Sequence, residues 1–332
     1  PEISQADDHL MYYHYSFLFV FFMYFLAAPI INPTVNQFLK NRYRHENFGK
    51  LFSYASILNR SLTFIATFVF GLLLDCNNFA FTFIYPVIGI LGIFSMYLLS
   101  FLDINENIEF KPKSSFFTGV KNSILRMYYL LKYDKPYFFF QVGFMLYGIA
   151  FMLTYSVVNI FFEDGVHLNY SSVAFYKNLS VILAILFLPV SGKLIGKIDP
   201  RKFGVITFAF LSVYLSFITL SCYFPAKHEV LGVQIIYMMV IAFIFNGLFA
   251  STMHLLWSIG SAYFCKKEDA GIYQSVHLSL TGTRALFAPM AGIILYRLTG
   301  FSFTFITGVF LIIIGILLLI WSQKKHRINI KS

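Results

Sequence analysis

The chain has 332 residues, of which 58% are apolar and only 12% are charged, and its formal net charge is +10. Soluble domains carry about 25% charged residues, so this composition excludes an ordinary soluble protein and indicates one that lies in a lipid bilayer. A basic charge is also typical of nucleic-acid binding, but membrane proteins collect Lys and Arg in cytoplasmic loops. We therefore expect the lipid bilayer as a partner, and no nucleic acid.

Apolar runs long enough to cross about 30 Å of hydrocarbon recur along the chain. The predicted fold class is an all-α membrane protein, a polytopic bundle of about nine transmembrane helices. A single helix over 230–264 would be about 52 Å long at 1.5 Å per residue, so we expect it to leave the membrane or to break near Gly247. The predicted spans are 12–39, 49–74, 79–102, 136–162, 172–197, 203–224, 230–264, 271–298 and 301–323.

Alternate loops hold 20 of the 25 lysines and arginines, whereas the intervening loops hold Lys227 and Arg297 alone. The positive-inside rule then places the basic loops and the C-terminus in the cytoplasm of a multi-pass protein of the cell (inner) membrane. Arg60, Lys177 and Arg284 lie inside spans, so topology does not explain them. The basic loops are 40–50, 111–135, 193–202, 266–267 and 324–331.

An internal repeat indicates the domain plan. The segment ENFGKLFSYASILNRSLTF from Glu46 aligns with EDAGIYQSVHLSLTGTRALF from Glu268 at a constant shift of 222 residues. Both segments follow a basic turn and carry a mid-span arginine six helices apart, which predicts two six-helix halves with three helices missing before residue 1. A plain linker remains the alternative for 103–135. The predicted domains are 1–102, the three-helix remainder of an N-terminal bundle; 103–135, a cytoplasmic linker with an amphipathic surface helix; 136–323, a C-terminal six-helix bundle; and 324–332, a basic cytoplasmic tail.

The segment GKLIGKIDPRK, residues 192–202, resembles the basic loop motif of the major facilitator superfamily in its second-half position. Gly196 stands where that motif usually has an acidic residue, and Lys197 replaces the following arginine. The resemblance implies helices four to twelve of a twelve-helix fold and a secondary transporter that works by alternating access. It also implies a gating loop formed by Gly192, Lys193, Lys197, Asp199 and Arg201.

Two spans carry a polar stripe at helical spacing, one with Arg60 and the other with Arg284. In a bilayer such a stripe faces helix partners or a water-filled cavity, and ionisable residues there mark substrate paths. Because a guanidinium group offers planar donors, we expect a transported small solute that is either anionic or strongly polar. The predicted substrate-binding residues are Arg60, Arg284, His277, Thr281, Gln274, Ser56, Thr63, Asn246 and His254.

A structural interpretation stays open beside this one. Ser and Thr stripes also pack helices together, and Arg284 can clamp broken backbone near Gly282 and Pro289. Lys177 lies near a helix end, so we expect it to extend to the membrane surface. His254 and His277 are candidates for a coupling proton, because histidine titrates near neutrality, and ordinary packing is the other interpretation of each.

The sequence contains no Walker loop, HExxH or CxxC motif, so we expect no catalytic residue, cofactor or metal and do not expect an enzyme. Two other functions stay open. One is a multispan membrane enzyme whose histidines and arginines hold an anionic lipid. The other is a non-transporting receptor on the same fold. Uptake driven by an ion gradient would separate transport from both.

Overall fold

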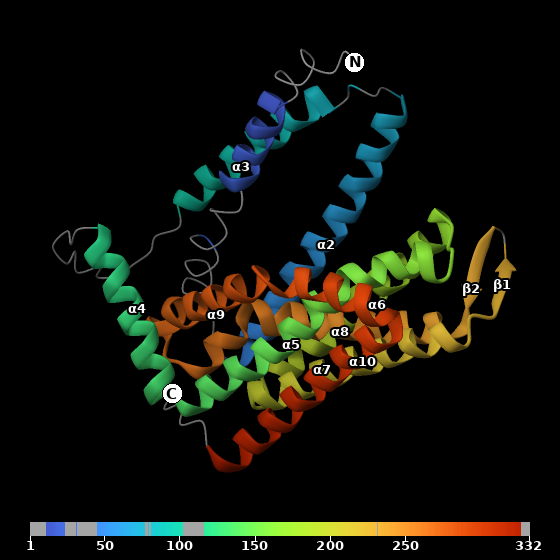
Figure 1. The fold of residues 1–332 in the computed structure, drawn as a ribbon. Helices are drawn as coiled ribbons and strands as arrows, with labels where there is room; N and C mark the ends of the chain where they lie inside the picture. The colour runs from blue at the N-terminus through green and yellow to red at the C-terminus, as the bar shows by residue number, and fades with distance from the viewer. Residues whose placement is uncertain are drawn as a thin grey trace.

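A helical bundle formed by the C-terminal part of the chain dominates the computed structural model (Figure 1). The structure describes residues 11–23, 31, 45–76, 79, 81–101, 116–230 and 232–326. Within the bundle α10 packs against α5 and α7, and α6 packs against α8. Its helices are α5 (Lys135–Ile160), α6 (Tyr170–Ile195), α7 (Pro200–Tyr223), α8 (Tyr237–Ile259), α9 (Ala270–Ala285) and α10 (Ala288–Lys325).

Five segments among the described residues are long and apolar enough to cross a membrane. The last of them has 56 residues, about 84 Å if it were one straight helix, so it is too long for a single crossing. The predicted all-α membrane bundle is confirmed. The segments are Lys135–Gly165, Ser172–Ile195, Pro200–Tyr223, Tyr237–Phe264 and Ala270–Lys325.

Short polar side chains fix where the bundle helices begin. Asp134 Oδ1 accepts the backbone N–H of Tyr137 at 3.0 Å at the start of α5. Asn169 and Asp199 cap α6 and α7 in the same way. Such caps satisfy N–H groups that the first helical turn leaves without partners.

The prediction of one helix over 230–264 is wrong at both ends. Its first residues belong to an antiparallel hairpin of β1 (Lys227–Val230) and β2 (Val233–Ile236), in which Lys227 lies opposite Ile236. Gly232 turns the hairpin with φ 77°, a backbone conformation that favours glycine. The apolar run is rich in β-branched residues, which favour strands. A 3₁₀ helix, Gly260–Phe264, follows α8, and Gly247 lies inside α8 without a break.

The hairpin is hydrogen-bonded to the start of α6. Ser172 Oγ accepts the N–H of Gln234 at 2.8 Å. Tyr176 Oη accepts the N–H of Ile236 at 2.7 Å and donates to Gln234 O at 3.1 Å. These bonds connect the start of α6 to the segment that leads into α8.

Two breaks interrupt the helix that follows. Residues Leu286 and Phe287 separate α9 from α10, and Pro289 lies in the first turn of α10, where its missing N–H is tolerated. Gly300 has non-helical backbone angles, φ 81° and ψ −179°. This second break falls between the predicted spans 271–298 and 301–323, whereas the first interrupts the former.

The N-terminal part contributes helical residues 11–23 and the helices α2 (His45–Cys76), α3 (Phe81–Ser100) and α4 (Phe116–Tyr133). Figure 1 shows α3 apart from the bundle and α4 across the end where α5 begins. Several predictions fall partly or wholly outside the described residues: most of the span 12–39, the basic residues Lys40, Arg42 and Arg44, the linker part 102–115, and the tail 327–332.

Helix α2 packs against α6 at one end of the bundle. We call this the basic end, because the exposed residues Lys193, Lys197, Lys266 and Lys324 lie there, and we call the opposite end the hairpin end. A Cβ atom on Gly49 would lie 2.6 Å from Gly192 O, and one on Gly192 would lie 2.5 Å from Ser53 Oγ. The two backbones approach closely because both positions lack a side chain.

Beyond this crossing α2 leaves the bundle. Phe48 and Ser53 are fully buried at the basic end, whereas Leu62 and Ile65 are each 57% exposed. Figure 1 shows α2 sloping away from the other helices toward its C-terminal end. The described part of α2 therefore contacts the bundle mainly through its first four turns.

Gly192→Val should destabilise the protein, because the added side chain meets α2 backbone and Ser53 without room to move. Overpacking of this kind costs about 1–3 kcal/mol. Thermal unfolding of the purified protein in detergent checks this. Gly282→Ala is the matched control, since nothing lies within 4 Å of a Cβ atom there. Equal melting temperatures for Gly192→Val and the control would contradict the close crossing.

Candidate functional site

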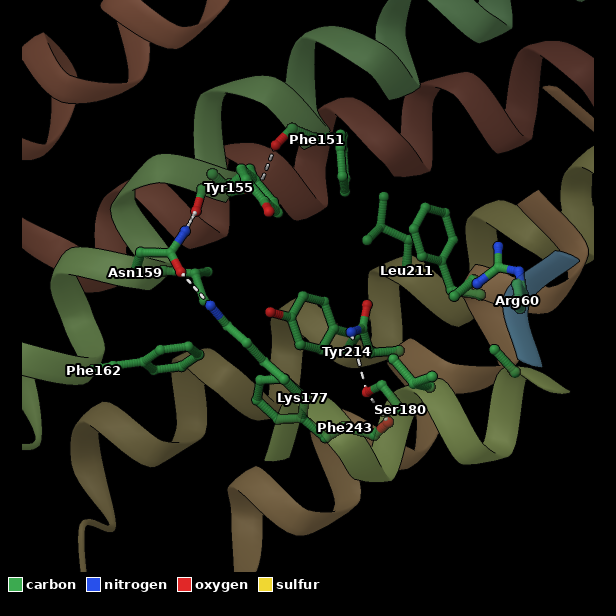
Figure 2. Close-up of a pocket in the computed structure, with 17 residues that line it drawn as sticks. Arg60, Phe151, Tyr155, Asn159, Phe162, Lys177, Ser180, Leu211, Tyr214 and Phe243 are labelled. Atoms are coloured by element: carbon green, nitrogen blue, oxygen red, sulfur yellow. Dashed lines mark hydrogen bonds between the residues drawn. The ribbon is translucent and has the colours of Figure 1, made fainter. Parts of the chain in front are cut away.

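A cavity of about 360 Å³ lies between α5, α6, α7 and α8, and α2 contributes Arg60 to its lining (Figure 2). Its size is in the range of small-molecule sites. Aromatic and aliphatic side chains form most of the walls. The polar and charged lining residues are Arg60, Thr154, Tyr155, Asn159, Lys177, Ser180, Tyr214 and Asn246.

Two cationic side chains face this cavity, and no Asp or Glu is among its described lining residues. Lys177 Nζ donates to Asn159 Oδ1 at 3.3 Å. Arg60 Nε is buried and has no hydrogen-bond partner among the residues that the structure describes. Arg60 is half-buried and Lys177 is exposed. With two cations and no carboxylate among its described lining residues, the cavity is electrostatically suited to an anion.

Neutral polar groups lie between α6 and α8. Ser180 Oγ donates to Phe243 O at 2.8 Å, and Asn246 Nδ2 donates to Ser180 Oγ at 3.2 Å. Gly247 packs in the same place, where a Cβ would lie 3.0 Å from Ser180 O. The sequence-predicted residue Asn246 therefore lines the cavity while its amide is held by α6.

Lys177 is a cavity-lining residue that the sequence analysis did not place in the site. It was expected to extend to the membrane surface; its side chain is exposed, lines the cavity and bonds to Asn159 on α5. A signal was present in the sequence: Lys177, Ser180 and Ala184 recur at spacings of three and four, and all three line the cavity. This is one face of α6, so periodicity could have placed Lys177 on it.

Ser56 and His254 meet directly between α2 and α8. Their Oγ and Nε2 atoms lie 2.9 Å apart. Ser56 Oγ also donates to Phe52 O at 2.8 Å, so the imidazole Nε2–H is the donor when both bonds form. The contact lies one helical turn nearer the basic end than Arg60 and Ala250. Thr63, also predicted for the site, is exposed and donates to Asn59 O.

The predicted residues of α9 lie elsewhere, in its contact with α5 and α8. Arg284 is 3% exposed. Its Nη1 donates to Phe144 O, and its guanidinium lies 5.7 Å from the centre of the Tyr147 ring. It also fills the space that a side chain on Gly148 would occupy. Arg284 is not among the residues lining the cavity of Arg60, so the two guanidinium groups do not share one cavity in this structure.

Other polar residues continue this contact. His277 Nδ1 lies 3.1 Å from Gln141 Oε1 on α5. Gln274 Nε2 donates to Trp257 O at 3.3 Å on α8, and Thr281 Oγ1 donates to the carbonyl of its own helix at His277. Both His277 and Gln274 are 1% exposed. Arg284 bonds to α5 and not to the backbone near Gly282 and Pro289 among the described contacts, and Nε2 of His277 and Oε1 of Gln274 have no hydrogen-bond partner among the described residues. The structural interpretation of this stripe and its role in substrate binding both stay predictions.

A family model described as Major Facilitator Superfamily matches residues 10–236. The chain belongs to the major facilitator superfamily. It is therefore an integral membrane protein and, in general terms, a secondary transporter of small molecules; members of this family are generally not enzymes. Comparison with curated proteins gives no match.

In this transporter the predicted gating loop divides between two contacts. Gly192 packs on α2, and Lys193 and Lys197 are exposed. Asp199 and Arg201 form an ion pair at 2.7 Å, with side-chain exposures of 30% and 1%.

Arg201 connects α7 to the end of α10. Its Nη1 donates to Ser322 O at 2.9 Å, Ser322 Oγ at 3.0 Å and His326 O at 2.7 Å. The carbonyls at a helix C-terminus favour a cation. Among the residues that the structure describes, the bonds of this pair are therefore with the C-terminal bundle, and its part in gating stays a prediction.

Arg201→Met should destabilise the transporter by about 3 kcal/mol, because it leaves Asp199 and the last carbonyls of α10 without their buried partner. Arg201→Lys should recover part of this loss, since it keeps the charge but not the guanidinium geometry. The exposed neighbour Lys202 supplies the control Lys202→Met. Thermal unfolding in detergent measures all three, and equal stability of both methionine variants would refute the assigned role.

Proposed function

We propose that this transporter binds a small organic anion in the cavity between Arg60 and Lys177 and moves it by alternating access. The observation that carries the proposal is the pair of cations without a carboxylate among the described lining residues. An anion would supply the missing counter-charge and accept hydrogen bonds from Arg60 Nε. Charge-assisted bonds of this kind are roughly twice as strong as neutral ones.

The position of α2 supports alternating access. It contacts α6 and α8 at the basic end and diverges from the bundle toward the hairpin end. A state that opens the basic end would have to separate Gly49 from Gly192 and Ser56 from His254. Rocking of one bundle against the other around a fixed site is a known way to do this.

We further propose that the basic end faces the cytoplasm and that the C-terminus lies there, in the cell (inner) membrane. The support is the charge of the loops, 20 of 25 lysines and arginines, since retention of Lys and Arg on the cytoplasmic side governs membrane insertion. The cavity would then lie nearer the outer side.

For α9 we propose a structural role first. Arg284 and His277 bond to α5, and Gln274 bonds to α8, so the stripe holds α9 to its neighbours. Thr281 satisfies its hydroxyl within α9. A solute that reaches these residues would require α9 to move away from α5.

Arg60→Gln should raise the KM for uptake of an organic anion at least tenfold, because a hydrogen bond to a charged group contributes about 1.5–3 kcal/mol. Arg60→Lys should retain part of the affinity. The control Arg297→Gln removes an exposed arginine outside the cavity. Uptake into proteoliposomes and equilibrium binding by the full-length protein are both measured. A KM for Arg60→Gln within twofold of the parent value would refute the proposal, and binding without gradient-driven uptake would indicate a receptor.

His254→Phe should slow uptake while leaving anion binding nearly unchanged. The substitution keeps an aromatic ring against Phe52, whose centre lies 5.9 Å from that of His254, but removes the hydrogen bond to Ser56. Because that bond joins α2 to α8 between the cavity and the basic end, its loss should weaken closure of the basic end. His254→Gln, which can still donate, is the comparison. Equal uptake rates for both variants and the parent protein would show that the contact has no part in transport.

A further inference from the structure

We infer that the transported anion is an elongated dianion, with one acidic group bound at Arg60, the other at Lys177, and an apolar body between them. This inference rests on the proposed function and narrows it to a substrate class. Figure 2 shows Arg60 and Lys177 on opposite sides of the cavity, with Leu211 and Tyr214 between them. The two charges are therefore separate binding points and not one cluster.

Contacts between the helices show where each of the two cations lies along the axis of α8. We call this position its level. Helix α2 runs antiparallel to α8, and Ser56 meets His254. Arg60, one turn further along α2, therefore stands level with about Ala250, one turn back along α8. Both residues line the cavity.

Lys177 stands at the other level. Ser180 bonds to Phe243 O and to Asn246, and Lys177 is nearly one turn closer to the hairpin end than Ser180. Asn159, the partner of Lys177, is next to the last residue of α5 at that same end. Counting 1.5 Å per residue along α8, the helix positions of the two cations differ in level by about 10–15 Å. Because Lys177 Nζ is also held at Asn159, on the opposite side of the cavity from Arg60, one small carboxylate does not bridge the two cations in this structure.

Most of the wall between these points is apolar, although Tyr214, Ser180 and Asn246 also line it. Phe151, Phe243 and Phe249 line it together with Val181 and Leu211. Each methylene group buried against such a wall tightens binding about fourfold. A ligand whose two charges lie close together, such as a phosphate monoester, would leave one cation unpaired and would place a charge against aromatic rings.

The experiment measures equilibrium binding of linear α,ω-dicarboxylates, from butanedioate to decanedioate, to the purified full-length protein. Monocarboxylates of the same chain lengths form the matched series. With two fixed cations, affinity for the dicarboxylates should pass through an optimum at an intermediate length and exceed that of the matched monocarboxylate at least tenfold. The monocarboxylates should instead tighten steadily with length. Dicarboxylates that follow the same steady trend, with no gain from the second carboxylate, would overturn the inference.

Lys177→Met should remove the optimum, so that no dicarboxylate binds more than about twofold tighter than the monocarboxylate of the same length. Lys193→Met, an exposed lysine in the last turn of the same helix, is the control and should leave both series unchanged. An optimum that persists in Lys177→Met would also overturn the inference.

Lys177→Glu gives a test that does not depend on loss of function. It should shift preference from the dicarboxylate of optimal length to the ω-amino acid of that length, since the new carboxylate pairs with an ammonium group. Failure of the proposed function looks different: neither carboxylate series binds, or Arg60→Gln leaves the affinity of the monocarboxylates unchanged.

Discussion

The close crossing of α2 on α6 is the contact on which the candidate site depends. Arg60 is the one described lining residue that α2 contributes to the cavity, and it reaches the cavity only because Gly49 and Gly192 let the two backbones meet. Transmembrane helices associate through close packing of this kind, because lipid gives little hydrophobic driving force between them. Two glycines at the basic end thus determine the charge of a cavity more than two helical turns away.

Arg284 is buried and Arg60 is half-buried, and the different surroundings of these two arginines have different consequences. Arg284 lies in a packed contact, where it donates to Phe144 O and lies over the Tyr147 ring. Arg60 lies at the edge of an open cavity among aromatic walls. Removing solvent from a cation is costly unless a partner replaces the water. In the packed contact Phe144 O and the Tyr147 ring belong to the fold, whereas in the cavity a solute would have to supply the partner; the Nε atoms of both arginines have no hydrogen-bond partner among the described residues.

The sequence was sufficient to predict the membrane class, the family and the face of α2 that carries Arg60. Helical periodicity selected Ser56, and position deep in an apolar run selected Asn246 and His254; that Ser56 meets His254 came from the structure alone. The prediction that Arg60 and Arg284 share one cavity does not hold in this structure, because the two repeat segments have different neighbours: α2 contacts α6 and α8, whereas Arg284 on α9 bonds to α5. The hairpin was not predicted because its β-branched residues continue the apolar run of α8. Lys177 was not placed in the cavity because a lysine near a helix end can extend either to the membrane surface or into the bundle.

The β1–β2 hairpin has a consequence for how the walls of the cavity can move relative to one another. Through Ser172 and Tyr176 it joins the beginnings of α6 and α8, and Ser180 joins the same helices at the next level. Lys177 lies between these attachments. The position of its backbone along α6 is therefore fixed relative to α8. Widening of the cavity at the hairpin end would then require the other helices to move away from α6 and α8. In the proposed mechanism a solute entering from that end would pass Lys177 before it reaches Arg60 on α2.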